Sequence, residues 1–162
     1  MTHTVLIIDD NIDYAEGVRE NLALYGISAL TASSGSEAER VTATNQPEVV
    51  FIDIKLGGEN GIDLLKRLRG RLRQSAFVMI TGYGTIDSAI ESLKLGAVDY
   101  LQKPITFESI LQTIQSLTPQ RASQEPGDRL AKAAVSGHMQ NLMEQIATLA
   151  ATELPVLILG EN

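Results

Sequence analysis

The 162-residue sequence predicts a doubly wound α/β domain, built on a five-stranded parallel sheet, over residues 1–117. Three continuous apolar runs, at 5–8, 49–52 and 77–80, are typical of strands that are buried on both faces. Segments in which apolar residues recur at helical spacing lie between these runs. Strict alternation of strands and helices implies parallel strands joined by right-handed crossovers, with helices on both faces of the sheet.

Shorter signals predict the remaining elements in chain order. Residues 28–32 and 98–101 are weaker strand candidates. Three helices are predicted from apolar residues spaced three and four apart, and segments 36–44 and 85–95 complete a set of five. The three apolar stripes are Ala15, Val18, Leu22 and Tyr25; Ile62, Leu65, Leu68 and Leu72; and Phe107, Ile110, Ile114 and Leu117. Gly26 follows the first stripe as a helix stop.

Composition narrows the class of protein further. The chain has 13 basic and 20 acidic side chains, a formal charge of -7, 44% apolar residues and no cysteine. It is therefore globular rather than disordered, and disulfides, thiolate zinc sites and cysteine nucleophiles are excluded. No apolar run approaches the ~20 residues of a membrane span, and no signal peptide precedes the first strand. We expect a cytoplasmic protein that binds no membrane and, because it is net acidic, no nucleic acid directly.

Residues suited to metal and phosphate chemistry follow the predicted strands. In chain order they are Asp9 and Asp10, then Asp53, then Thr81, and after the last strand Lys103 and Pro104. Ligands of such sheets bind beyond the carboxyl ends of the strands. We therefore expect three carboxylates, a hydroxyl and an ammonium group to converge at one edge of the sheet.

This set of groups favours phosphoryl transfer to an aspartate. Neighbouring carboxylates repel one another, and Mg²⁺ relieves the repulsion through carboxylate oxygens and retained waters. Asp53 could then form an aspartyl phosphate, with charge supplied by Mg²⁺ and Lys103 and a hydrogen bond by Thr81. Each residue alone also has a purely structural interpretation, since Asp10 or Asn11 could cap the next helix.

Residues 1–117 resemble the receiver domain of bacterial two-component response regulators. The matching motifs are LIIDDN, FIDIKL followed by NG, VMITGYG and DYLQKP. The resemblance implies a flavodoxin-like, CheY-like strand order of 2-1-3-4-5 and phosphorylation of Asp53 by a sensor histidine kinase. It also implies that Asp10, Asp53 and the Lys55 carbonyl ligate Mg²⁺, and that Asp9 holds a metal-bound water.

The same resemblance assigns the conformational switch. Thr81 and Lys103 would bind the phosphoryl oxygens, Tyr100 would be the switch aromatic, and Lys103–Pro104 would be a cis peptide. Homodimers would form through the face built by residues 85–95, 98–101 and 107–117. One departure is visible, because Gly57 replaces the proline usual in the family and Gly58 follows it. Glycine adds backbone entropy, so the loop at 56–60 is predicted to be looser.

The remainder of the chain is expected to be a linker and a helical and strand extension. Residues 118–127 contain two prolines and a glycine, which is typical of a linker. Residues 128–162 resemble the truncated start of the AAA+ ATPase domain of nitrogen-regulation-type sigma-54-dependent activators. GEN at the end would open a P-loop, whose second glycine and lysine are not in the sequence. The alternative is an accessory helix and strand.

The resemblance thus implies a phosphorylation-dependent regulator rather than an enzyme. In a full-length protein its partners would include a downstream AAA+ domain and sigma-54 RNA polymerase. The main alternative is a small Mg²⁺-dependent phosphatase with an aspartate nucleophile. Such enzymes carry a second aspartate two residues after the nucleophile, where this chain has Lys55. A phosphorylation-independent interaction module is disfavoured because the acidic set and the lysine are all present.

Overall fold

The computed structural model describes residues 4–82 and 86–118, so the predictions for the linker beyond Thr118 and for residues 128–162 lie outside the described residues. Seven strands occur in this part of the chain: β1 (Thr4–Ile8), β2 (Ser28–Ala32), β3 (Val49–Asp53), β4 (Lys55–Leu56), β5 (Glu59–Asn60), β6 (Ala76–Thr81) and β7 (Asp99–Gln102). The helices are α1 (Ile12–Leu24), α2 (Gly35–Thr44), α3 (Gly61–Arg71), α4 (Ile86–Lys94) and α5 (Phe107–Leu117).

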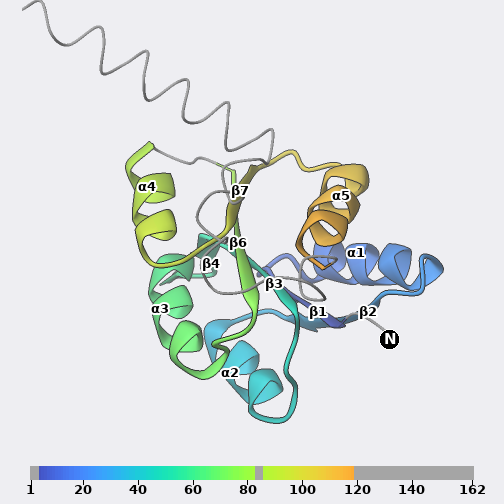
Figure 1. The fold of residues 1–162 in the computed structure, drawn as a ribbon, viewed down its shortest axis with the longest axis horizontal. Helices are drawn as coiled ribbons and strands as arrows, with labels where there is room; N and C mark the ends of the chain where they lie inside the picture. The colour runs from blue at the N-terminus through green and yellow to red at the C-terminus, as the bar shows by residue number, and fades with distance from the viewer. Residues whose placement is uncertain (1–3, 83–85, 119–162) are drawn as a thin grey trace, which may run out of the picture.

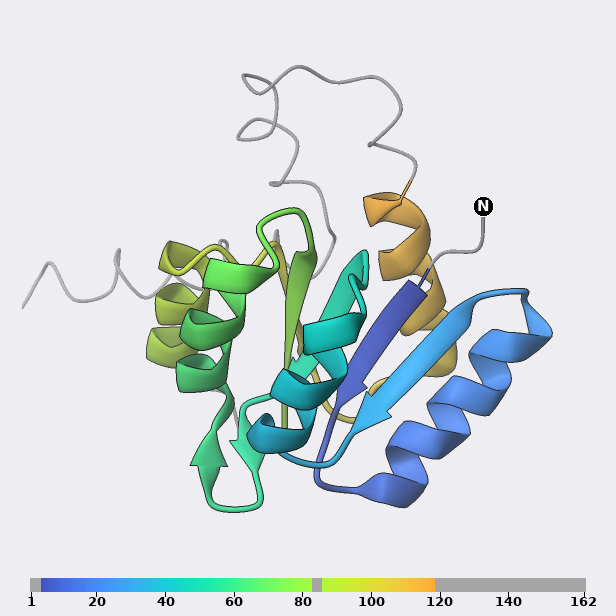
Figure 2. The same cartoon turned by 90° about the horizontal axis from the view of Figure 1, so that it is seen from below.

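Five of the strands form one parallel sheet in the order β2-β1-β3-β6-β7. All four strand pairs of this sheet are parallel. Counted along the chain, these strands have the order 2-1-3-4-5, so the predicted fold class is confirmed. The order places β1 and β3 side by side at the centre, with β6 next to β3, and the carboxyl ends of all three point to one edge (Figure 2).

Successive residues of each central strand pack on opposite faces of the sheet, which is why the strands are continuous apolar runs. In β1, Val5 and Ile7 join the apolar cluster under α1 and α5, whereas Leu6 and Ile8 join the cluster under α2 and α3. Figures 1 and 2 show α1 and α5 on one side of the sheet and α2, α3 and α4 on the other. The apolar faces of the helices are thus buried against strands that the sequence predicts from their apolar runs.

Most residues of the predicted helix stripes are buried, Phe107 and Leu117 are partly buried, and Tyr25 is exposed. Ile62, Leu65, Leu68 and Leu72 are fully buried, as are Ile110 and Ile114, and Ala15, Val18 and Leu22 are buried in α1. The placement of Tyr25 on the buried face of the first helix is wrong. α1 ends at Leu24, and the Tyr25 side chain is 60% exposed. None of the helices in the described ranges is both long and apolar enough to cross a membrane.

A short antiparallel hairpin, β4–β5, stands where a loop was predicted at 56–60. Its turn consists of Gly57 (φ 52°) and Gly58 (φ 106°), and positive φ at both central residues is a feature of the type I′ class of two-residue hairpin turns. Proline, whose φ is fixed near −65°, could not adopt either conformation. Arg67 of α3 pairs with Glu59 of the hairpin and with Glu39 of α2, which ties the hairpin to both helices. The predicted looseness of this segment stays a prediction.

Candidate functional site

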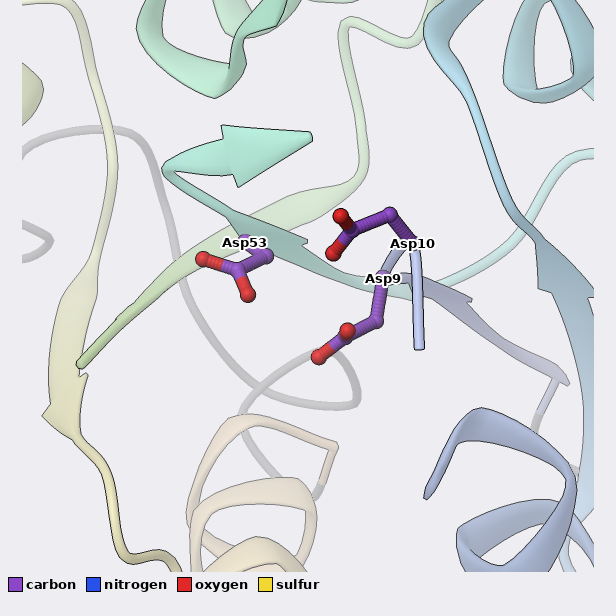
Figure 3. A group of neighbouring side chains, drawn as sticks. All are labelled: Asp9, Asp10 and Asp53. Carbon is purple, nitrogen blue, oxygen red and sulfur yellow. The ribbon is translucent and has the colours of Figure 1, made fainter. Parts of the chain in front are cut away.

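Three carboxylates meet where the central strands end. Asp9 and Asp10 directly follow β1, and Asp53 is the last residue of the neighbouring strand β3. One oxygen from each of the three carboxylates lies within 4.8 Å of the others (Figure 3). The convergence follows from the parallel sheet, because adjacent strands bring their carboxyl ends to the same edge.

Lys103 joins the two buried carboxylates of this group. Asp9 and Asp53 are 1% and 5% exposed, and the Lys103 Nζ donates to Asp9 Oδ2 at 2.7 Å and to Asp53 Oδ2 at 2.6 Å. Lys103 follows β7, and its own amide donates to the Thr81 carbonyl at 2.7 Å. Burial, the largest single influence, lowers the pKa of Lys103, but the two carboxylates together raise it above its ordinary value. The ammonium group is therefore charged at neutral pH.

The second oxygen of each buried carboxylate is held by a nearby backbone amide. Asp9 Oδ1 accepts from the Asn11 amide at 2.9 Å, and Asp53 Oδ1 accepts from the Lys55 amide at 3.0 Å. Lys55 begins β4 and its side chain is exposed. These hydrogen bonds from backbone amides orient both carboxylates in the absence of a ligand.

Asp10 is the exposed member of the group. Its Oδ2 accepts a hydrogen bond from the Gly57 amide at 3.1 Å, so it touches the tip of the hairpin. Asp10 does not cap α1, because Asn11 occupies the N-cap position and accepts from the Tyr14 amide at 3.1 Å. Of the two capping candidates, Asn11 is therefore the cap and the Asp10 carboxylate remains at the site.

After the β4–β5 hairpin, the chain returns to begin α3 beside Asp53. The Gly61 amide donates to the Ile54 carbonyl at 2.8 Å, and Asn60 caps the helix by accepting from the Ile62 amide. A Cβ on Gly61 would collide with the Asp53 carbonyl oxygen. Only glycine allows α3 to start this close to Asp53.

The other predicted site residues lie around this group. Thr81 is buried at the end of β6, one residue beyond Ile80, which pairs with Asp53. Tyr100 lies in β7, is 9% exposed, and belongs to the apolar cluster under α2 and α3. Within the described ranges its hydroxyl is buried with no hydrogen-bond partner. The Lys103–Pro104 peptide bond is cis.

The donor set fits a hard divalent cation. Three carboxylates carry three formal negative charges, and Lys103, whose ammonium contacts Asp9 and Asp53, carries one positive charge. The excess negative charge and the oxygen-only donors suit Mg²⁺, and the exposed position of Asp10 leaves room for the waters that this ion retains. Asp9, Asp10, Asp53 and the Lys55 carbonyl are the groups that would hold the ion, directly or through water.

Tyr14 is a site residue that the sequence did not reveal. The Lys103 Nζ lies over its ring, 5.2 Å from the ring centroid, and its buried hydroxyl has no hydrogen-bond partner among the described residues. Tyr14 stands four residues after Asp10 beside the apolar stripe of α1, so helical spacing alone assigns it to packing. Its contact with Lys103 depends on tertiary structure.

The sequence is similar to those of known regulatory proteins. The family model described as the response regulator receiver domain matches residues 5–115. The C4-dicarboxylate transport transcriptional regulatory protein DctD of Pseudomonas aeruginosa is 29% identical over 170 residues, which cover 98% of this chain and 37% of that protein. The response regulator protein PilR of the same species is 32% identical over 160 residues, covering 97% and 36%. The chain thus spans little more than a third of the length of these relatives.

Solved structures share the fold. A two-component response regulator from Clostridium difficile superposes with a TM-score of 0.72 at 26% identity, covering 75% of this chain and 100% of that one. A response regulator from Burkholderia pseudomallei, solved with a phosphorylated aspartic acid, calcium ion and citrate, has a TM-score of 0.65 at 26% identity, covering 96% and 77%. Since the matched family model spans 111 positions, from 5 to 115, well over half of the sequence, the chain belongs to the receiver domain family of two-component response regulators.

Proposed function

We propose that this chain accepts a phosphoryl group on Asp53 from a sensor histidine kinase, with Mg²⁺ bound at the acidic group. The observation that carries the proposal is the position of Asp53, a buried carboxylate in contact with Lys103 and within 4.8 Å of two further carboxylates. Receiver domains bind Mg²⁺ at such groups and interact with histidine kinases. The phosphorylated aspartic acid of the Burkholderia pseudomallei regulator supports the same chemistry.

In the proposed reaction, a carboxylate oxygen of Asp53 attacks phosphorus. The bond between phosphorus and the donor nitrogen breaks, and the nitrogen leaves with the bonding electrons. Mg²⁺, held by Asp10, Asp53 and the Lys55 carbonyl with Asp9 holding a bound water, would offset negative charge on the phosphoryl group. Lys103 neutralises further charge, because its ammonium group already lies at the attacking carboxylate.

The phosphorylated state would bias a conformational switch. Phosphorylation adds charge and acceptor oxygens next to the end of β6, where Thr81 could move toward them. Tyr100 on the adjacent strand β7 is already buried in this structure, so phosphorylation would hold its ring in this inward position. This shifts a two-state equilibrium of the face formed by α4, β7 and α5, through which we propose homodimers form.

The proposed output is transcription activation. Both quoted Pseudomonas relatives align over nearly all of this chain, so their similarity extends beyond the described receiver fold. This supports residues 1–117 as the receiver, 118–127 as a linker and 128–162 as the start of a sigma-54-type AAA+ domain. We propose that in a full-length protein this domain engages sigma-54 RNA polymerase in the cytoplasm, and that the receiver domain itself is regulatory.

Labelling with acetyl phosphate tests the proposal without knowledge of the kinase. In the presence of Mg²⁺, intact-mass measurement should show one added phosphoryl group on the parent protein and none on Asp53→Asn. Asp63→Asn is the matched control, because Asp63 is an exposed carboxylate on α3 outside the acidic group. Full labelling of Asp53→Asn would remove Asp53 from its role.

A turnover assay distinguishes the phosphatase alternative. A receiver domain should form one acyl phosphate per chain and show no sustained turnover of a small phosphomonoester. Steady release of phosphate from p-nitrophenyl phosphate, lost in Asp53→Asn, would instead favour the phosphatase.

A further inference from the structure

We propose that Tyr14 is a positioning residue for Lys103, and that the face of its ring holds the ammonium group at the phosphoryl-accepting carboxylate throughout the transfer. The inference rests on the proposed function of Asp53. The observation behind it is the position of Lys103 Nζ over the Tyr14 ring, 5.2 Å from the centroid. A cation at this distance from an aromatic face is attracted by the quadrupole of the ring.

Lys103 has three partners, and only Asp53 changes during phosphorylation, because the Asp9 carboxylate and the Tyr14 ring are not modified. The ion pair to Asp53 Oδ2 depends on the negative charge of that carboxylate. When an Asp53 oxygen becomes bonded to phosphorus, the carboxylate charge is lost and the pair weakens. The Tyr14 ring keeps its quadrupole in both states, so it can keep Lys103 in place while charge moves onto the phosphoryl oxygens. Such fixed electrostatic partners are preorganised for the transition state.

The position of the ring is fixed from the same edge of the sheet. The Tyr14 amide donates to Asn11 Oδ1 at 3.1 Å, and the Asn11 amide donates to Asp9 Oδ1 at 2.9 Å. The ring also packs against the apolar cluster under α1 and α5. These hydrogen bonds connect Asp9, a carboxylate that binds Lys103, through Asn11 to the backbone of Tyr14, and the apolar packing then orients the ring.

The ring, and not the hydroxyl, makes the contact. Within the described ranges the hydroxyl is buried and has no hydrogen-bond partner, so no hydrogen bond explains where the ring lies. Burial raises the pKa of Tyr14; the Lys103 charge lowers it by less, and the Asp9 and Asp53 charges raise it slightly, so the hydroxyl stays neutral at neutral pH. A phenylalanine would present the same face to Lys103 and would leave no polar group unsatisfied.

Two substitutions separate the ring from the hydroxyl. Tyr14→Phe keeps the aromatic face, whereas Tyr14→Leu keeps an apolar side chain without it. With acetyl phosphate and Mg²⁺, the maximal phosphorylation rate should fall about three- to tenfold in Tyr14→Leu, the range of a partly exposed cation–π contact, and stay at the parental value in Tyr14→Phe. The donor concentration for half-maximal rate should not change, because Lys103 is placed rather than removed.

The control and a spectroscopic readout exclude a merely structural role. Tyr25→Leu removes an exposed tyrosine at the far end of α1 and should phosphorylate at the parental rate. The NMR signals of the Lys103 ε-methylene should carry a ring-current shift in the parent and in Tyr14→Phe, which is lost in Tyr14→Leu. Tyr14→Met, with a flexible apolar side chain, replaces the leucine variant if urea unfolding shows that leucine is not accommodated.

The inference is overturned by a folded Tyr14→Leu with the parental rate, or by a Tyr14→Phe that is slowed as much as Tyr14→Leu. Equal ε-methylene shifts in the parent and Tyr14→Leu would overturn it as well, and this readout requires no phosphorylation. Absence of labelling in the parent protein would contradict the proposed function of Asp53 instead, so the two failures are distinguishable.

Discussion

Lys103 compensates the charges of the two buried carboxylates. It donates to both Asp9 and Asp53, and its side chain is 29% exposed. Lys103→Met leaves two uncompensated carboxylates and should lower the free energy of unfolding by about 1–3 kcal/mol, less than a fully buried pair would lose. Urea unfolding without Mg²⁺ measures the change. A variant as stable as the parent would show that the ion pairs of Lys103 with Asp9 and Asp53 contribute no stability.

The pH dependence of the same difference follows from the raised pKa of Lys103. A raised folded-state pKa contributes stability that is fully present below the ordinary lysine pKa of 10.5 and is lost as the pH rises through the folded value. The stability difference between the parent and Lys103→Met should therefore be constant near neutral pH and shrink above pH 10.5.

Substitution of Asp10 tests whether Mg²⁺ binds at the acidic group. Asp10→Asn keeps an oxygen for the Gly57 amide and removes one of three repelling charges, so stability without Mg²⁺ should rise by roughly 1 kcal/mol. Mg²⁺ at tenfold its dissociation constant should stabilise the parent by about 1.4 kcal/mol and the variant by much less. Thermal unfolding with and without Mg²⁺ measures both effects. Asp13→Asn, an exposed neighbour in α1, is the control, and an unchanged Mg²⁺ effect in Asp10→Asn would exclude Asp10 as a ligand.

At the residue scale, the sequence predicted the acidic group but not the contacts that Tyr14 and Gly57 make with the site. Asp9, Asp10 and Asp53 were identified because parallel strands bring their carboxyl ends to one edge, a rule that needs only the strand positions. Tyr14 was missed because its partner Lys103 is far along the chain and the ring face has no sequence signature. The hydrogen bond from Gly57 to Asp10 was missed because an amide donor does not depend on residue type.

At the element scale, the hairpin and the end of α1 show where periodicity fails. β4 and β5 have two residues each, too short for an alternating pattern, and a glycine pair indicates a loose loop as readily as a tight turn. Tyr25 has the correct spacing for the buried stripe, but α1 ends one residue earlier and the stripe rule does not locate helix ends. The three inner strands β1, β3 and β6 were predictable because double-sided burial leaves continuous apolar runs, whereas the edge strands β2 and β7 gave weaker signals.

The two kinds of glycine in these elements should respond oppositely to alanine. Gly58 has φ 106°, which L residues rarely adopt, so Gly58→Ala should destabilise the protein by about 1–2 kcal/mol. Gly17 lies within α1 with no atom within 4 Å of an added Cβ, so Gly17→Ala should stabilise it by roughly 0.5–1 kcal/mol. Urea unfolding of both variants measures the difference. Destabilisation of equal size in both would contradict the assigned turn conformation.

At the scale of the whole molecule, the receiver fold closes at α5. Ile110 and Ile114 are buried against the sheet, and Leu117 packs at the edge of the same cluster. A chain that ends after residue 120 should therefore keep the parental unfolding midpoint in urea and the parental labelling of Asp53. It should also self-associate less in analytical ultracentrifugation, because it lacks the apolar residues Met139, Leu142, Met143, Ile146 and Leu149. Loss of folding on this truncation would show that the domain boundary near residue 117 is misplaced.

The location of the phosphoryl group tests the central claim most directly. After labelling with acetyl phosphate and Mg²⁺, proteolysis and tandem mass spectrometry should place the added group on Asp53, the acceptor that Lys103 contacts at 2.6 Å. Asp9 and Asp10, which share the site, should be unmodified in the same digest. Modification of Asp9 or Asp10 with Asp53 unlabelled would contradict the account, because it would make Asp53 a metal ligand and not the acceptor.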